Sequence, residues 1–181
     1  SGTSASGTGG ATSGGTGGTG GTGATGGTTG GSGGSTTWPP EVTVLTSASG
    51  ETETTAGDLA RGAEMPDLGW ASSSEMACFP GTGEASFGGN HVLYATLLPA
   101  YSKVTITAVP DDPLTDLSLY AYRIEATVHD VPPSIETSLG CESSYDPQNG
   151  NPGESESVKL VSVADPLNVV IGVAGVQGTS S

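Results

Sequence analysis

The first 37 residues of the chain contain only Gly, Thr, Ser and Ala, and this tract ends abruptly at Trp38-Pro39-Pro40. All 19 acidic and 4 basic residues follow position 40. A segment without charged or large apolar side chains cannot bury enough surface to offset the entropy of ordering it. The sequence therefore predicts two physically different parts, a low-complexity Gly/Thr arm over residues 1–40 and a patterned body after it.

Within the arm, a hydroxyl residue recurs at every third position from Ser13 to Thr28. The simplest interpretation is a flexible Gly-rich spacer. In a polyproline-II-like helix, which has three residues per turn, these hydroxyls would line one edge and form a row suited to O-linked sugar. A collagen triple helix fits the glycine spacing, but the run is short and lacks proline. The predicted O-glycosylation sites are Thr16, Thr19, Thr22, Thr25 and Thr28.

The formal net charge of −15 disfavours nucleic acid and anionic membranes as partners. No apolar run reaches the length of about 18 residues that a membrane-spanning helix needs. The chain begins at Ser1 rather than Met, which suggests that a targeting segment has been removed. Together with the arm, these features lead us to expect an extracellular or cell-surface protein.

The chain contains two cysteines, Cys78 and Cys141. In an exported single-domain protein, two cysteines most simply pair as one disulfide. The loop between them (residues 79–140) would make the crosslink worth about 4 kcal/mol in the chain-entropy account. The alternatives are two buried free thiols or redox chemistry, and the latter usually requires a Cys-x-x-Cys spacing that is absent here.

Apolar and polar residues alternate with period two in the body, as expected for half-buried strands. Residues 103–109 place Val104, Ile106 and Ala108 on one side and polar residues mostly on the other. Residues 169–174 are apolar on both faces, which predicts a central strand. The other predicted strands cover residues 41–46, 92–97, 116–122 and 158–164.

Runs rich in Gly, Pro, Asn and Asp separate these strands, and helical periodicity is scarce. Several short alternating strands with turns between them favour an all-β fold, and we expect an antiparallel, jelly-roll-like β-sandwich. The expected domains are the arm at 1–40, a connecting strand or linker at 41–66 and the sandwich at 67–181.

Several short motifs in the body resemble the bacterial pre-peptidase C-terminal domain over roughly residues 67–176. They are FGGNHVLY at 87–94, LPAYSKVTIT at 98–107, DLSLY at 116–120, ESESV at 154–158 and the final strand at 169–175. The resemblance implies a secreted β-sandwich that accompanies enzymes or surface proteins without being catalytic, with relatives that bind calcium or a polymer. Ser118 stands where the family often repeats Asp, which is a departure from the calcium-binding pattern.

Catalysis needs a nucleophile, a base or a metal within mutual reach, and no recognised catalytic motif is present. The sequence has neither Gly-x-Ser-x-Gly nor His-Glu-x-x-His. Of the two histidines, His91 shares the strand parity of Leu93 and Ala95, which predicts a buried structural role, and His129 precedes Asp130 in a predicted loop. We therefore expect a protein without enzymatic activity.

Two ligand hypotheses follow from the residues of the body. Asp111, Asp112 and Asp116 form an acidic loop, and calcium prefers clustered carboxylate and carbonyl oxygens; ordinary solvated acids are the alternative. Tyr120 and Tyr122 share one face of a strand, about 6.6 Å apart, and would form a stacking platform for sugar. The alternative is that the two rings pack under a neighbouring segment.

The leading functional hypothesis is an extracellular structural protein that is displayed, or self-assembled into a filament, through its arm. The strand at 41–46, which carries Val42 and Val44, follows a long lead and is the natural donor for strand addition to another copy. Such a head-to-tail contact does not close on itself. The alternative is a monomeric, surface-tethered module that binds a polysaccharide or a protein, with calcium as a possible cofactor.

Overall fold

The computed structural model describes residues 37–46, 48–73, 85–135, 138–144 and 152–178. All of these residues belong to one compact unit that spans residues 33–181. The second unit, residues 1–32, lies outside the described residues. The first strand of the compact unit follows Trp38-Pro39-Pro40 within a few residues.

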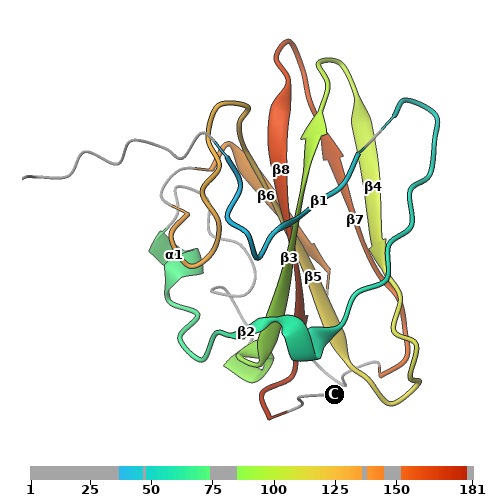
Figure 1. Ribbon diagram of the computed structural model, residues 1–181, viewed down its shortest axis with the longest axis vertical. Coiled ribbons are helices and arrows are strands. Elements are labelled where there is room, and N and C mark those ends of the chain that lie inside the picture. The colour runs from blue at the N-terminus through green and yellow to red at the C-terminus, as the bar shows by residue number, and fades with distance from the viewer. Residues whose placement is uncertain (1–36, 47, 74–84, 136–137, 145–151, 179–181) are drawn as a thin grey trace, which may run out of the picture. The chain divides into compact units, whose positions relative to one another are not determined.

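Strands make up most of the described secondary structure (Figure 1). They are β1 (Thr43–Val44), β2 (Ala63–Glu64), β3 (Asn90–Leu98), β4 (Lys103–Ala108), β5 (Leu117–Glu125), β6 (Gly140–Ser144), β7 (Glu156–Val161) and β8 (Leu167–Gly175). The larger sheet has the order β1-β3-β8-β5-β6, and β2 also pairs with β3. The smaller sheet consists of β4 and β7. All described pairings are antiparallel except that of β1 with β3.

Helical structure in the described residues is limited to short segments. They are η1 (Leu59–Arg61), α1 (Trp70–Ser73) and η2 (Ala85–Phe87). In this part of the chain there is no helix with the length and apolar character needed to span a membrane. The prediction of an all-β fold dominated by antiparallel pairing is therefore confirmed.

Each strand predicted from the alternation has a counterpart in the structure. The run at 169–174 becomes β8, which lies between β3 and β5 as its two apolar faces predict. The run at 41–46 is reduced to the two residues of β1. In contrast, the sequence of β6, GCESS, has no apolar alternation and does not predict a strand.

One face of the larger sheet packs against β4 and β7. Val158 and Leu160 of β7 join side chains from β3, β5 and β8 in a single apolar cluster, so the two sheets bury apolar surface against each other. The buried members of this cluster are Tyr94, Leu98, Leu119, Ala121, Val158, Leu160, Val169 and Ile171.

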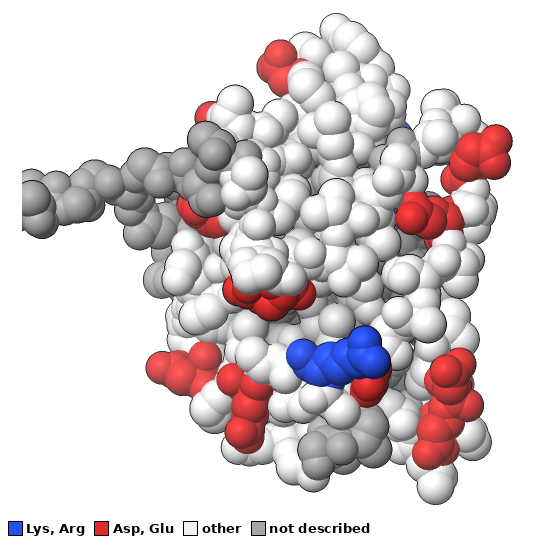
Figure 2. All heavy atoms as spheres, viewed as in Figure 1, with Lys and Arg blue, Asp and Glu red and all other residues white. Residues whose placement is uncertain are grey.

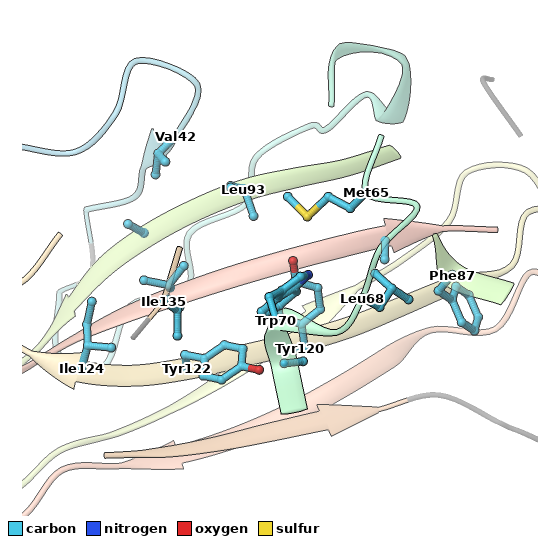
Figure 3. Close-up of a cluster of buried hydrophobic side chains, with 14 residues drawn as sticks. Val42, Met65, Leu68, Trp70, Phe87, Leu93, Tyr120, Tyr122, Ile124 and Ile135 are labelled. Atoms are coloured by element: carbon cyan, nitrogen blue, oxygen red, sulfur yellow. The ribbon is translucent and has the colours of Figure 1, made fainter. Parts of the chain in front are cut away.

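The opposite face of the larger sheet is covered mainly by segments that are not strands (Figure 3). Trp70 of α1 lies over Tyr120 and Tyr122 of β5, with ring centroids 5.9 Å from each. These rings belong to a second apolar cluster, the cluster beneath α1, which also contains Met65 and Leu68 from the segment before α1. The larger sheet therefore carries apolar clusters on both faces, which explains why residues 169–174 of β8 are apolar on both sides.

Candidate functional site: the groove beside β4

A groove of about 1040 Å³ opens between the two sheets. Its floor is the face of β3 and β8 that carries Val92, Tyr94, Ile171 and Val173. One wall is β4, and the other is the segment 48–59, called the strap below. Pockets that hold small ligands usually measure about 300–1,000 Å³, so this groove is large enough for an extended ligand.

The groove runs along the edge of β4. Consecutive residues from Val104 to Val109 line it, whereas β3 contributes only the alternate residues Val92, Tyr94 and Thr96. One edge of β4 pairs with β7, and no backbone hydrogen bond to its other edge is found among the described residues. The groove thus contains a row of backbone N–H and C=O groups that are available to another strand.

The loop after β4 separates this strand from the larger sheet. Pro110 and Pro113 lack the N–H that a sheet ladder needs. The carboxylate of Asp112 accepts a hydrogen bond of 2.8 Å from the backbone N–H of Leu114. The backbone carbonyl of Asp112 accepts a second one of 3.0 Å from the N–H of Thr115. This turn directs the chain into β5 of the other sheet and leaves β4 at the edge of its own.

The strap is polar, and its described residues from Ala48 to Asp58 are all exposed. It approaches the floor closely at Gly57, where a Cβ atom would lie 2.3 Å from the hydroxyl of Tyr94. At its end, the carbonyl of Leu59 accepts a hydrogen bond of 2.9 Å from Nδ2 of Asn90 on β3. The strap is therefore held to β3 at one end and borders the groove without forming a strand.

The charged residues that line the groove are all acidic. They are Glu51, Glu53 and Asp58 on the strap and Asp111 and Asp112 on the loop after β4, and together they are called the acidic rim. Within the described part of the chain, Asp58 alone among them has an ion-pair partner, the exposed Arg61 at 3.5 Å. Figure 2 shows acidic side chains spread over the viewed face, with little basic surface among them. A groove lined by charges of one sign attracts ligands of the opposite sign.

The predicted calcium ligands Asp111, Asp112 and Asp116 lie in the loop between β4 and β5. Asp111 and Asp112 are exposed, and the Asp112 carboxylate accepts the turn hydrogen bond described above. No group of three or more His, Cys, Asp or Glu side chains that could hold a metal ion is found among the described residues. Calcium binding stays a prediction, and two of its proposed ligands, Asp111 and Asp112, line the groove.

The two tyrosines of the predicted stacking platform share one face of β5, as expected from their spacing. Both are fully buried, because α1 covers them with Trp70. Their rings meet edge to face with centroids 6.1 Å apart. Tyr120 and Tyr122 therefore form no exposed platform in the structure, and the alternative, packing under a neighbouring segment, describes their environment.

His91 has the buried structural position that its parity predicts. It is 2% exposed, its Nε2 lies 2.8 Å from the carbonyl of Phe87, and its Nδ1 lies 3.0 Å from the hydroxyl of Tyr120. Burial lowers the pKa of His91, against a smaller raising effect from the Phe87 hydrogen bond. Both ring nitrogens are engaged, so His91 has none available for a substrate even though it borders a second cavity of about 460 Å³. His129 packs edge to face on Trp38 at 4.8 Å.

The predicted donor strand lies on its own chain. Thr43 and Val44 of β1 pair in parallel with Tyr94 and Ala95 of β3. Val42 is buried in the cluster beneath α1, whereas Val44 is 57% exposed. In the structure, β1 therefore pairs with β3 of its own chain rather than with a strand of a second copy.

Several predicted sites cannot be placed. Cys78 lies outside the described residues, and so do all of the predicted O-glycosylation sites in the arm. Cys141 is half-buried on β6 beside the cluster beneath α1, and no free cysteine is found in the described part of the chain. The disulfide and the glycosylation of Thr16, Thr19, Thr22, Thr25 and Thr28 stay predictions.

The strap is the part of the site that sequence reasoning missed. Its Glu51 and Glu53 lie in a run of Thr and Glu between two strands, which is typical of an exposed loop. The sequence gives one indication of this role: Glu51, Glu53 and Asp58 add negative charge shortly after an arm that carries none. No family model matches the chain, and no curated protein matches it. The resemblance to the pre-peptidase C-terminal domain stays a prediction.

Proposed function

We propose that the chain is an extracellular, non-enzymatic binding module: a jelly-roll-like β-sandwich carried on its Gly/Thr arm, with a binding site in the groove beside β4. The sandwich is supported by the apolar cluster shared between the two sheets. The extracellular location is supported by the low-complexity Gly/Thr arm. We also propose a bacterial origin, which is supported only by the resemblance to the pre-peptidase C-terminal domain.

The observation that carries this proposal is the combination of an apolar floor and an unpaired strand edge in one groove. Val92 and Val173, which are half-buried, offer apolar contacts, and β4 offers main-chain hydrogen bonds. Apolar surface contributes about 25 cal/mol per Å² buried, and edge pairing fixes the orientation of the ligand. A protein or a polymer chain fits such a site better than a small molecule.

Self-assembly by strand exchange is the second candidate. It is favoured by the shortness of β1, which pairs with β3 through only two residue pairs and directly follows the arm. A neighbour could supply residues 41–46 at the same place, with Val42 in the same buried site. Because each copy carries a net charge of −15, this exchange must overcome repulsion between the copies.

The test is a ligand screen with a variant that fills the groove. Full-length protein is applied to an array of defined glycans and to a displayed peptide library, in parallel with Ile106→Trp, whose side chain enters the groove. Val161→Trp is the matched control, since Val161 is exposed on β7 and does not line the groove. We expect ligands that bind wild type and Val161→Trp but not Ile106→Trp. Ligands that bind all three proteins equally would refute a site in the groove.

A further inference from the structure

The smaller sheet covers only part of the larger one. β7 lies beside β5 and β6, so the two-stranded sheet packs over that half. The smaller sheet ends at β4: among the described residues no strand pairs with its other edge, and the exposed strap borders the groove on that side. The position next to β4, where a third strand would complete the smaller sheet, is the groove itself.

We propose that the groove binds an extended, cationic polypeptide segment, which pairs with the free edge of β4 as an added strand. This inference rests on the proposed function and specifies its ligand. β4 is six residues long, which corresponds to about 20 Å of extended chain. Alternate side chains of the added strand would point to the apolar floor, and the others to solvent and to the acidic rim.

Neither the strap, the arm nor the segment 41–46 is a suitable strand for this place. The strap between Ala48 and Asp58 contains no large apolar residue, and the arm before Trp38 contains none either. Residues 41–46 do alternate, but Val42 is buried and β1 is paired with β3. The added strand is therefore expected to come from a different protein.

The negative charge of the acidic rim determines which strands from other proteins can bind in the groove. Glu51, Glu53 and Asp111 are exposed carboxylates without a basic partner among the described residues, and no Lys or Arg lines the groove. A second copy of this chain, with its net charge of −15, is repelled by such a rim. A segment with Lys or Arg at alternate positions is attracted, and that attraction weakens as salt is added.

The experiment is titration calorimetry of the full-length protein with a series of short blocked peptides. The probe alternates Val with Lys and Thr and is slightly longer than β4. One comparison peptide replaces each Lys by Glu, and a second replaces the central residues by Pro, which removes the N–H groups that a ladder needs. We expect the Lys peptide to bind at least about tenfold more tightly than either comparison peptide.

Two matched triple variants test the rim. In the first, Glu51→Gln, Glu53→Gln and Asp111→Asn remove three rim charges. In the second, Glu125→Gln, Glu142→Gln and Glu154→Gln remove three exposed charges that do not line the groove. We expect the rim variant to bind the Lys peptide about tenfold more weakly, and the control variant to bind it within about twofold of wild type.

The outcomes separate this inference from the proposed function. Equal binding of the Pro peptide contradicts strand addition, and equal effects of the two triple variants contradict selection by the rim. If the Glu peptide or a glycan binds wild type but not Ile106→Trp, the groove is a binding site and the cationic strand is wrong. If no probe and no glycan binds, both the inference and the proposed function fail.

Discussion

Nδ1 of His91 lies 3.0 Å from the hydroxyl of Tyr120, and this contact joins β3 to β5 across the strand between them, β8. The Tyr120 ring reaches across β8 because Gly172 stands opposite it in the ladder. A Cβ atom at Gly172 would lie 2.0 Å from Cζ of Tyr120. The contact between β3 and β5 therefore depends on a glycine in the central strand, where glycine is otherwise unfavourable.

Replacement of Gly172 by Ala is expected to destabilise the fold by about 3 kcal/mol, because the added methyl group collides with a ring that has no room to move. Tyr120 is fully buried beneath Trp70, which prevents relief of the clash by rotation toward solvent. Chemical denaturation of wild type and Gly172→Ala measures the change in the free energy of unfolding.

The matched control is a double-mutant cycle with Tyr120→Ala. This change removes the ring, so Gly172→Ala is expected to cost much less in the Tyr120→Ala background than in wild type. An equal cost in both backgrounds would show that the ring over Gly172 is not the cause.

The buried His91 makes stability depend on pH. Because burial lowers its pKa in the folded state, the unfolded state binds the proton more readily. The contribution of His91 to the free energy of unfolding is fully present above its unfolded-state pKa of about 6.5. This contribution is lost as the pH falls below that pKa toward the lower pKa of the folded state. His91→Gln keeps a donor for Phe87 and an acceptor for Tyr120 but does not titrate. The loss of stability between about pH 7 and pH 5 should be smaller in this variant, and identical slopes would contradict the account.

The strands of the body could be predicted from the sequence because period-two alternation reports burial directly. Val104, Ile106 and Ala108 alternate in burial with their polar neighbours in β4, as the pattern indicates. The same reasoning could not find the partner of β4, since pairing depends on residues far apart in the chain. The pattern also could not show that Tyr120 is buried, because the cover comes from Trp70, some 50 residues earlier.

The candidate site was harder to predict for a related physical reason. The groove is formed by an unpaired edge and by the strap, and neither has a sequence signature of its own. The sequence predicts Asp111 and Asp112 as calcium ligands, and it does not indicate that they also belong to a larger acidic rim. Their neighbours across the groove, Glu51 and Glu53, come from a separate part of the chain.

Cys78 and Cys141 are expected to form one disulfide. Thiol titration of the denatured, unreduced protein should detect no free thiol. Reduction should lower the free energy of unfolding by about 4 kcal/mol, because it releases a long loop in the unfolded state. Two reactive thiols per chain would rule out the pairing.

Truncations at the N-terminus separate the binding module from the filament. Deletion of residues 1–36 retains β1 and should change neither stability nor association state in analytical ultracentrifugation. Deletion of residues 1–46 also removes Val42 from its buried site, which should cost about 1.5–3 kcal/mol. Filaments of the full-length protein that disappear on deletion of residues 1–46 would favour strand exchange instead.

The central claim is that a strand adds to β4 in the groove, and amide hydrogen exchange of the full-length protein tests it most directly. With saturating Lys peptide, exchange should slow markedly at every second amide of residues 103–109, those that point to the free edge of β4. The other amides of β4 and those of β7 should change little, because they already lie in the ladder between β4 and β7. The slowing should be absent in Ile106→Trp and present in Val161→Trp. Unchanged exchange along β4 in the presence of bound peptide, or equal slowing in Ile106→Trp, would contradict the account.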